Sequence, residues 1–181
     1  MLNSFKDYIK KTPYKTQFRF MFMQLAQLLV IYLVFLPLIV AVANWMDYCP
    51  SALGYSVGDN VILFIVAMPI KVFLETLIYQ YCVFHVFNLI ESIDDITPLY
   101  ILTSAILFAV VHFIGIDGPA ILMVIRFLTA FFAGIVFAAS FNIIYLKGRK
   151  PLLSVFCIHT IYNFIIILTC VFFELFGINL F

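Results

Sequence analysis

Charged residues are scarce in this chain, since only 10% of its 181 residues are Asp, Glu, Lys or Arg, while 66% are hydrophobic. Ordinary soluble domains carry about 25% charged and about 45–50% apolar residues. A water-soluble fold of this size cannot bury so large an apolar fraction, so the composition excludes a soluble domain. The near balance of charge, +1 overall, gives no basic surface of the kind that binds polyanions, so no nucleic-acid partner is expected.

Cysteine is also sparse, with four residues in the chain, at positions 49, 82, 157 and 170. Three of them lie in apolar runs, where cysteine behaves as a small hydrophobic residue. No C-x₂-C spacing typical of a zinc site is present. The cysteines therefore predict neither a disulfide framework nor a metal centre.

Long apolar runs make up most of the chain, and each is near the roughly 20 residues that a helix needs to cross a bilayer core. We therefore predict an all-α, polytopic membrane helix bundle of about five transmembrane helices. The spans are expected at about 20–43, 61–87, 99–116, 120–146 and 152–176. They form a single membrane domain, 19–181, after a basic cytoplasmic or interfacial segment, 1–18.

The basic residues predict the orientation, because Lys and Arg concentrate in cytoplasmic segments. With the N-terminus inside, eight of the ten basic residues fall in such segments, at positions 6, 10, 11, 15, 19, 147, 149 and 150. The predicted orientation is N-terminus cytoplasmic and C-terminus outside. We expect an integral protein of the bacterial inner (cytoplasmic) membrane.

Small residues recur at four-residue spacing in the fourth predicted span, at Ala130, Gly134 and Ala138. This spacing is typical of a face on which two membrane helices approach closely. It therefore predicts helix packing rather than catalysis.

A few ionisable residues lie inside the predicted spans, where charge is costly and often functional. They are Lys71, Glu75, His85, His112, Arg126, His159 and Glu174. Lys71 and Glu75 are four residues apart on one helix face, so they can form an ion pair. Arg126 is expected to snorkel or to pair locally with Asp117, and His85 to lie near the inner interface.

Four polar residues of the predicted spans share one depth. Counted at about 1.5 Å per residue from the cytoplasmic ends, they lie on the order of 10–20 Å deep; they are Glu75, His112, His159 and Asn163. A carboxylate and an imidazole can activate water, and an imidazole with an amide can stabilise an oxyanion. The set therefore indicates a general-base hydrolase.

Three short segments resemble the motifs of one known family. In chain order they read LETLIYQ at 74–80, FAVVH at 108–112 and HTIYN at 159–163. They are similar to the EExxxR, FxxxH and HxxxN motifs of the CAAX protease and bacteriocin-processing (CPBP, or Abi) family of intramembrane glutamate proteases. The resemblance covers residues 61–163. Two positions depart from the first motif, with Thr76 in place of glutamate and Gln80 in place of arginine.

The resemblance implies a role for each residue of the set. Glu75 would be the general base with His112 as its partner, while His159 and Asn163 would stabilise the oxyanion. The implied activity is an intramembrane endopeptidase acting on a peptide or protein tail presented from the cytoplasmic side. Family members cleave prenylated tails or mature and export peptides, so the expected partners are membrane lipid and a lipidated or leader-peptide substrate.

The two departures keep other functions open. They replace both partners of a charge pair, which destabilises a protein less than replacing one partner and leaving the other charge buried and unpaired. The site is therefore either intact or that of a catalytically inactive scaffold that binds a membrane partner. A small proton-coupled transporter is a third alternative, although the chain shows no internal repeat. Glu75 can also be only the ion-pair partner of Lys71.

No cofactor is expected. Zinc is a minor alternative, because Glu75, His112 and His159 have the His₂Glu composition of a zinc site, although no HExxH motif is present. The oligomeric state is left open by the sequence.

Overall fold

The computed structural model of the chain describes residues 17–46, 61–90, 97–114 and 118–175. These residues are almost entirely helical, and no strand occurs among them, which confirms the predicted all-α bundle. In chain order the helices are α2 (Gln17–Trp45), α3 (Val61–Glu75), the π-helix η2 (Thr76–Cys82), α4 (Val83–Ile90), α5 (Thr97–Phe113), α6 (Ala120–Leu146) and α7 (Pro151–Leu175). Nearly all of the predicted basic segment 1–18 lies outside the described residues, as does Asp117.

Each predicted span corresponds to one helical rod, because α3, η2 and α4 follow one another without a break. Within α2, the α3–α4 rod, α6 and α7, the apolar stretches are 19 to 28 residues long, which is enough to cross a membrane. Helix α5 is shorter, with 17 residues, or about 26 Å at 1.5 Å per residue. That length is slightly below the roughly 30 Å of a hydrocarbon core.

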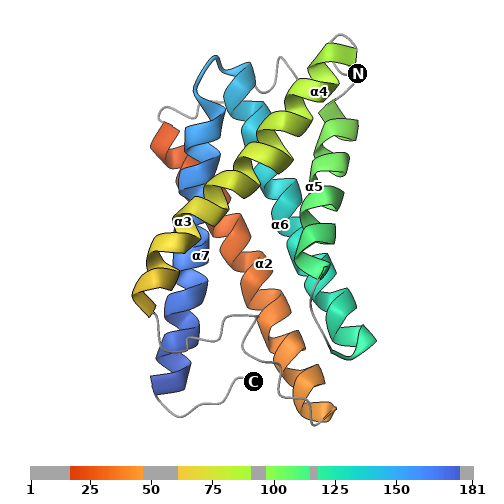
Figure 1. Cartoon of the computed structure of the whole chain (residues 1–181), viewed down its shortest axis with the longest axis vertical. Helices are drawn as coiled ribbons and strands as arrows, with labels where there is room; N and C mark the ends of the chain where they lie inside the picture. Colours follow the sequence, from red (N-terminus) through yellow and green to blue (C-terminus); the bar gives the residue numbers. More distant parts are fainter. Residues whose placement is uncertain (1–16, 47–60, 91–96, 115–117, 176–181) are drawn as a thin grey trace.

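Successive rods run in opposite directions. In Figure 1, α2 runs from the upper to the lower end of the bundle, the α3–α4 rod returns diagonally across the front, α5 descends, α6 rises and α7 descends. The start of α2 and the end of α7 therefore lie at opposite ends of the bundle. This is the relationship that the predicted N-inside, C-outside orientation requires.

Proline and glycine mark where the last helices begin and end. Pro119 directly precedes α6 and Pro151 is the first residue of α7, positions at which the missing N–H costs nothing. Helix α6 ends at Leu146, two residues before Gly148, which has φ of +66°, a left-handed conformation that glycine adopts easily. The amides of Gly148 and Arg149 donate to the carbonyls of Tyr145 and Ile144, which closes the helix end.

Helices α5 and α6 approach each other closely. A Cβ atom added at Gly134 would lie 2.9 Å from the Cα of Ala105, so only glycine fits here. Ala138, one turn further along, is fully buried. Gly134 of this small-residue series thus packs against α5, as the sequence predicts, whereas Ala130 lines a cavity inside the bundle.

The outer surface of the bundle is apolar. Large aliphatic and aromatic side chains are exposed on every helix, among them Leu33, Leu89, Leu99, Val124 and Leu168. In water such a surface would aggregate, whereas in a bilayer it faces lipid tails. Buried polar side chains gather instead inside the bundle.

Candidate active site

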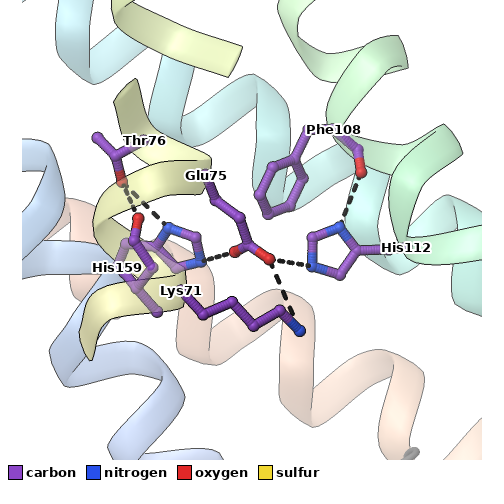
Figure 2. Close-up of polar contacts among 7 residues, drawn as sticks. Lys71, Glu75, Thr76, Phe108, His112 and His159 are labelled. Carbon is purple, nitrogen blue, oxygen red and sulfur yellow. Dashed lines mark hydrogen bonds and ion pairs between the residues drawn. The ribbon is translucent and has the colours of Figure 1, made fainter. Parts of the chain in front are cut away.

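The carboxylate of Glu75, at the end of α3, lies between two histidines from other helices (Figure 2). Its Oε1 atom is 3.8 Å from Nε2 of His112, and its Oε2 atom is 3.6 Å from Nε2 of His159. Glu75 is buried and only 7% exposed. The structure therefore brings together three of the four residues that the sequence singles out.

Lys71 approaches the same carboxylate from one turn earlier in α3, with Nζ 3.7 Å from Oε1 of Glu75. The Lys71 side chain is largely exposed, so it contacts Glu75 from the surface of the bundle. Glu75 is thus an ion-pair partner of Lys71, as one alternative held, and it also contacts both histidines. The ion pair alone does not account for its position.

His112 is oriented by its own helix. Its Nδ1 atom is 2.8 Å from the carbonyl oxygen of Phe108, which can only accept, so Nδ1 carries a proton. The Nε2 atom that faces Glu75 therefore holds the lone pair whenever the ring is neutral. Such an atom can accept a proton or a hydrogen bond from water.

His159 is oriented by Thr76, the first residue of η2. The Thr76 hydroxyl donates its single proton to the carbonyl of Val72 at 2.8 Å, so it accepts from Nδ1 of His159 at 3.4 Å. His159 also presents Nε2 to Glu75 and is almost fully buried. Both imidazoles therefore turn the same nitrogen toward the carboxylate.

This orientation has a consequence for the protons of the site. Two neutral imidazoles and an ionised carboxylate would place only acceptors against each other. At separations of 3.8 and 3.6 Å, the carboxylate and the two rings are too far apart for direct hydrogen bonds. The three acceptors are therefore arranged to receive a donor such as water.

A π-helical segment fixes Glu75 and Thr76. Its wider turn leaves backbone carbonyls whose hydrogen bonds are completed by side chains, a device frequent at functional sites. The amide nitrogen of Gln80 donates to the carbonyls of Glu75 and Thr76, at 3.3 Å each. From α5, Ser104 donates to the carbonyl of Tyr79 at 2.6 Å, and Tyr100 reaches the carbonyl of Gln80 at 3.4 Å.

One face of α5 thus serves the whole site, because four of its residues recur at four-residue intervals: Tyr100, Ser104, Phe108 and His112. The first two hold the π-helix and the last contacts Glu75. The Phe108 ring lies between the histidines, with its centroid 4.2 Å from that of His112 and 5.5 Å from that of His159. Phe137 of α6 also packs against His159, with ring centroids 4.3 Å apart, and contacts the Phe108 ring.

A cavity of about 170 Å³ adjoins the two histidines. Asn163, one turn after His159 on α7, lines this cavity together with both imidazoles. Asn163 is therefore beside the two histidines in the cavity lining, whereas Glu75 contacts the histidines but does not line the cavity. Arg126 of α6 lines the same cavity, whereas the sequence suggested snorkelling or a pair with Asp117.

The sequence reasoning missed three residues of the site. It treated Thr76 and Gln80 as departures from a motif, although they orient His159 and the π-helix carbonyls. It also gave no role to Ser104, a polar residue of the third predicted span, whose four-residue spacing to Phe108 was the available signal. His85 lies apart from the cluster, against the rings of Tyr81 and Phe84.

Metal binding was the remaining alternative for this set. Within the described residues, no three His, Cys, Asp or Glu side chains are placed to hold a metal ion together. Each histidine faces a different oxygen of Glu75.

Comparison with protein families gives a match over the central part of the chain. The family model "type II CAAX prenyl endopeptidase Rce1-like" matches residues 57–165, which is more than half of the chain and includes all four candidate site residues. Comparison with curated proteins and with solved structures gives no match.

Proposed function

Because the chain belongs to the Rce1-like family of type II CAAX prenyl endopeptidases, we propose that this integral membrane protein hydrolyses a peptide bond with water activated by Glu75. The observation that carries the proposal is the placement of the Glu75 carboxylate within 4 Å of Nε2 of both His112 and His159. Both rings are oriented through Nδ1, so the reactive nitrogens converge on one carboxylate.

The attacking water is placed between Glu75 and His112. A water molecule at about 2.8 Å from both Oε1 and Nε2 fits across their 3.8 Å separation. The carboxylate takes one proton while the water oxygen bonds to the peptide carbonyl carbon. When the tetrahedral intermediate breaks its C–N bond, that proton passes to the leaving amine, so Glu75 is restored.

The negative oxygen of the intermediate needs donors on the other side of the cavity. The Asn163 side-chain amide is a neutral donor that lines it. The second proposed donor is Nε2 of His159, which donates when the ring carries a proton on both nitrogens. In this proposal the low-polarity walls formed by Phe108 and Phe137 strengthen both interactions.

The proposed substrate is a prenylated C-terminal tail or a leader peptide that reaches the site within the membrane. A lipid anchor on the substrate would remain among the lipid-facing helices while the peptide enters the bundle. We propose the bacterial inner membrane as its location, with cleavage on tails that arrive from the cytoplasmic side. The neutral residues Thr76 and Gln80 do not argue against activity, because both are engaged in holding the site.

The test is hydrolysis by the full chain in lipid nanodiscs, followed by mass spectrometry of farnesylated peptides and leader peptides. Glu75→Gln keeps the shape but removes the base, so we expect a rate loss of about 10²–10⁴-fold. His85→Gln changes a histidine outside the cluster and is the matched control. Cleavage by Glu75→Gln at the wild-type rate would contradict the proposal.

The second candidate is an inactive scaffold that binds a membrane partner, favoured by the loss of both charged residues of the first motif. The same experiment separates the two functions. A scaffold binds the peptides with or without Glu75 and releases no product. The protease yields fragments only when Glu75 is present.

A further inference from the structure

Arg126 is the one residue of the cavity lining that carries a fixed positive charge. It sits on α6, in the same 170 Å³ cavity as His112, His159 and Asn163. A cation inside a membrane bundle is expensive and usually faces a substrate pathway or a specific anion. The mechanism proposed above leaves this residue without a role.

The separation between Arg126 and the reacting groups suits a short peptide. Phe137 packs against the His159 ring and marks the level of the site on α6. Arg126 precedes Phe137 by 11 residues, or about 16 Å along a helix. Allowing for the reach of the arginine side chain, the gap is on the order of 10–16 Å, which an extended peptide of about three to five residues covers.

The wall between these two points is small and aliphatic. Its lining includes Ala130 and Ala133 of α6 and Ile166 and Ile167 of α7. Such a wall accepts aliphatic side chains and offers few polar partners. The cavity volume is below the roughly 300–1,000 Å³ of pockets for drug-sized ligands, so it suits the end of a peptide rather than a folded segment.

We propose that Arg126 binds the free carboxylate at the C-terminus of the substrate tail, while the aliphatic residues before it occupy the cavity. The inference rests on the proposed endopeptidase function. A C-a-a-X tail has three residues and a terminal carboxylate after its lipidated cysteine. The planar guanidinium binds a carboxylate through two parallel hydrogen bonds, which gives both charge and geometric recognition.

This arrangement determines where the chain is cut. With the terminal carboxylate held at Arg126, the peptide bond that reaches Glu75 and His112 is set by the number of residues between them. The protein then recognises tails by their ends rather than by an internal sequence. A peptide that continues past the third residue would have to place a neutral amide against the guanidinium.

The test measures binding rather than turnover. The probe is a farnesylated peptide ending in Cys-Val-Leu-Ser, prepared with a free C-terminal carboxylate and as the C-terminal amide. Both bind to the full-length Glu75→Gln protein in nanodiscs, where no cleavage interferes. We expect the acid to bind at least about tenfold more tightly than the amide, because a charge-assisted pair is lost in the amide.

Adding Arg126→Gln should reduce the affinity for the acid to that for the amide and leave the amide unchanged. Arg126→Lys keeps the charge but not the paired geometry, so it should retain part of the preference. Arg149→Gln removes an exposed cation outside the cavity and is the matched control. Unfolding temperatures of the three variants verify that each is folded.

Three results would overturn the inference. They are equal affinity for acid and amide in the Glu75→Gln protein that keeps Arg126, an acid preference that survives Arg126→Gln, and failure of both peptides to bind. Failure of the proposed function is a separate outcome. If Glu75→Gln does not slow hydrolysis, the mechanism is wrong, while the acid-to-amide ratio still reports on Arg126.

Discussion

The hydroxyl of Thr76 accepts from Nδ1 of His159 at 3.4 Å while donating to the carbonyl of Val72 at 2.8 Å. The related motif has a glutamate at this position. A carboxylate would accept from Nδ1 in the same way, but it would add a second buried charge beside Glu75 and would need a cation to balance it. With a hydroxyl here, Gln80 can replace the arginine as well, because no charge has to be neutralised.

Thr76→Val separates the packing of this side chain from its hydrogen bond to His159. Valine has nearly the same shape, but it leaves Nδ1 of His159 without an acceptor, so the proton can move to Nε2 and the ring loses its fixed orientation. We expect kcat to fall by about 10–100-fold, the range seen when an orienting partner is removed. Thr76→Ser keeps the acceptor and should retain most of the activity.

The measurement is the pH profile of kcat together with the unfolding temperature. A change in the profile with Thr76→Val but not Thr76→Ser supports a positioning role. Equal loss of activity in both variants, with an unchanged profile, would show that Thr76 serves packing alone.

The carbonyls of the π-helix give a prediction about stability. Ser104→Ala leaves the buried carbonyl of Tyr79 without its donor from α5, at a cost of about 1–3 kcal/mol. Ser154→Ala also removes a buried hydroxyl, but Ser154 donates to the carbonyl of Lys150, the residue directly before α7, and not to the π-helix. We therefore expect a clear fall in unfolding temperature only for Ser104→Ala, measured in the same detergent. An equal fall for both variants would contradict a special role for the π-helix contacts.

The sequence was sufficient to predict the helices and the three residues that come together at the site. Apolar runs near the length of a bilayer core give the spans, and the order of the three motifs places Glu75, His112 and His159 on different rods. Periodicity could not reveal η2, because residues 76–82 differ from an ordinary apolar helix only in their hydrogen bonds. The direction of the Arg126 side chain was equally hidden, since it depends on how α6 is rotated against α7.

Close packing of α5 on α6 predicts that Gly134→Ala is destabilising. The added methyl group would meet the Ala105 backbone, which cannot move aside as a flexible side chain could. Overpacking of this kind costs about 1–3 kcal/mol, so the unfolding temperature should fall, and activity with it because α5 carries His112. Leu153→Ala, on an exposed position, is the control. Wild-type stability of Gly134→Ala would show that the two helices lie further apart.

Glu75 and His112 should behave as one catalytic unit. If both hold the same water molecule, removing either partner releases it, and removing the second partner costs little more. We expect Glu75→Gln and His112→Gln each to lower kcat/KM by a large factor, and the double variant to match the worse of the two. Multiplicative losses would mean that the groups act independently and that no water is shared between them. Unfolding temperatures of the three variants verify that each is folded. The losses in kcat/KM are then converted to free energies and compared in a double-mutant cycle.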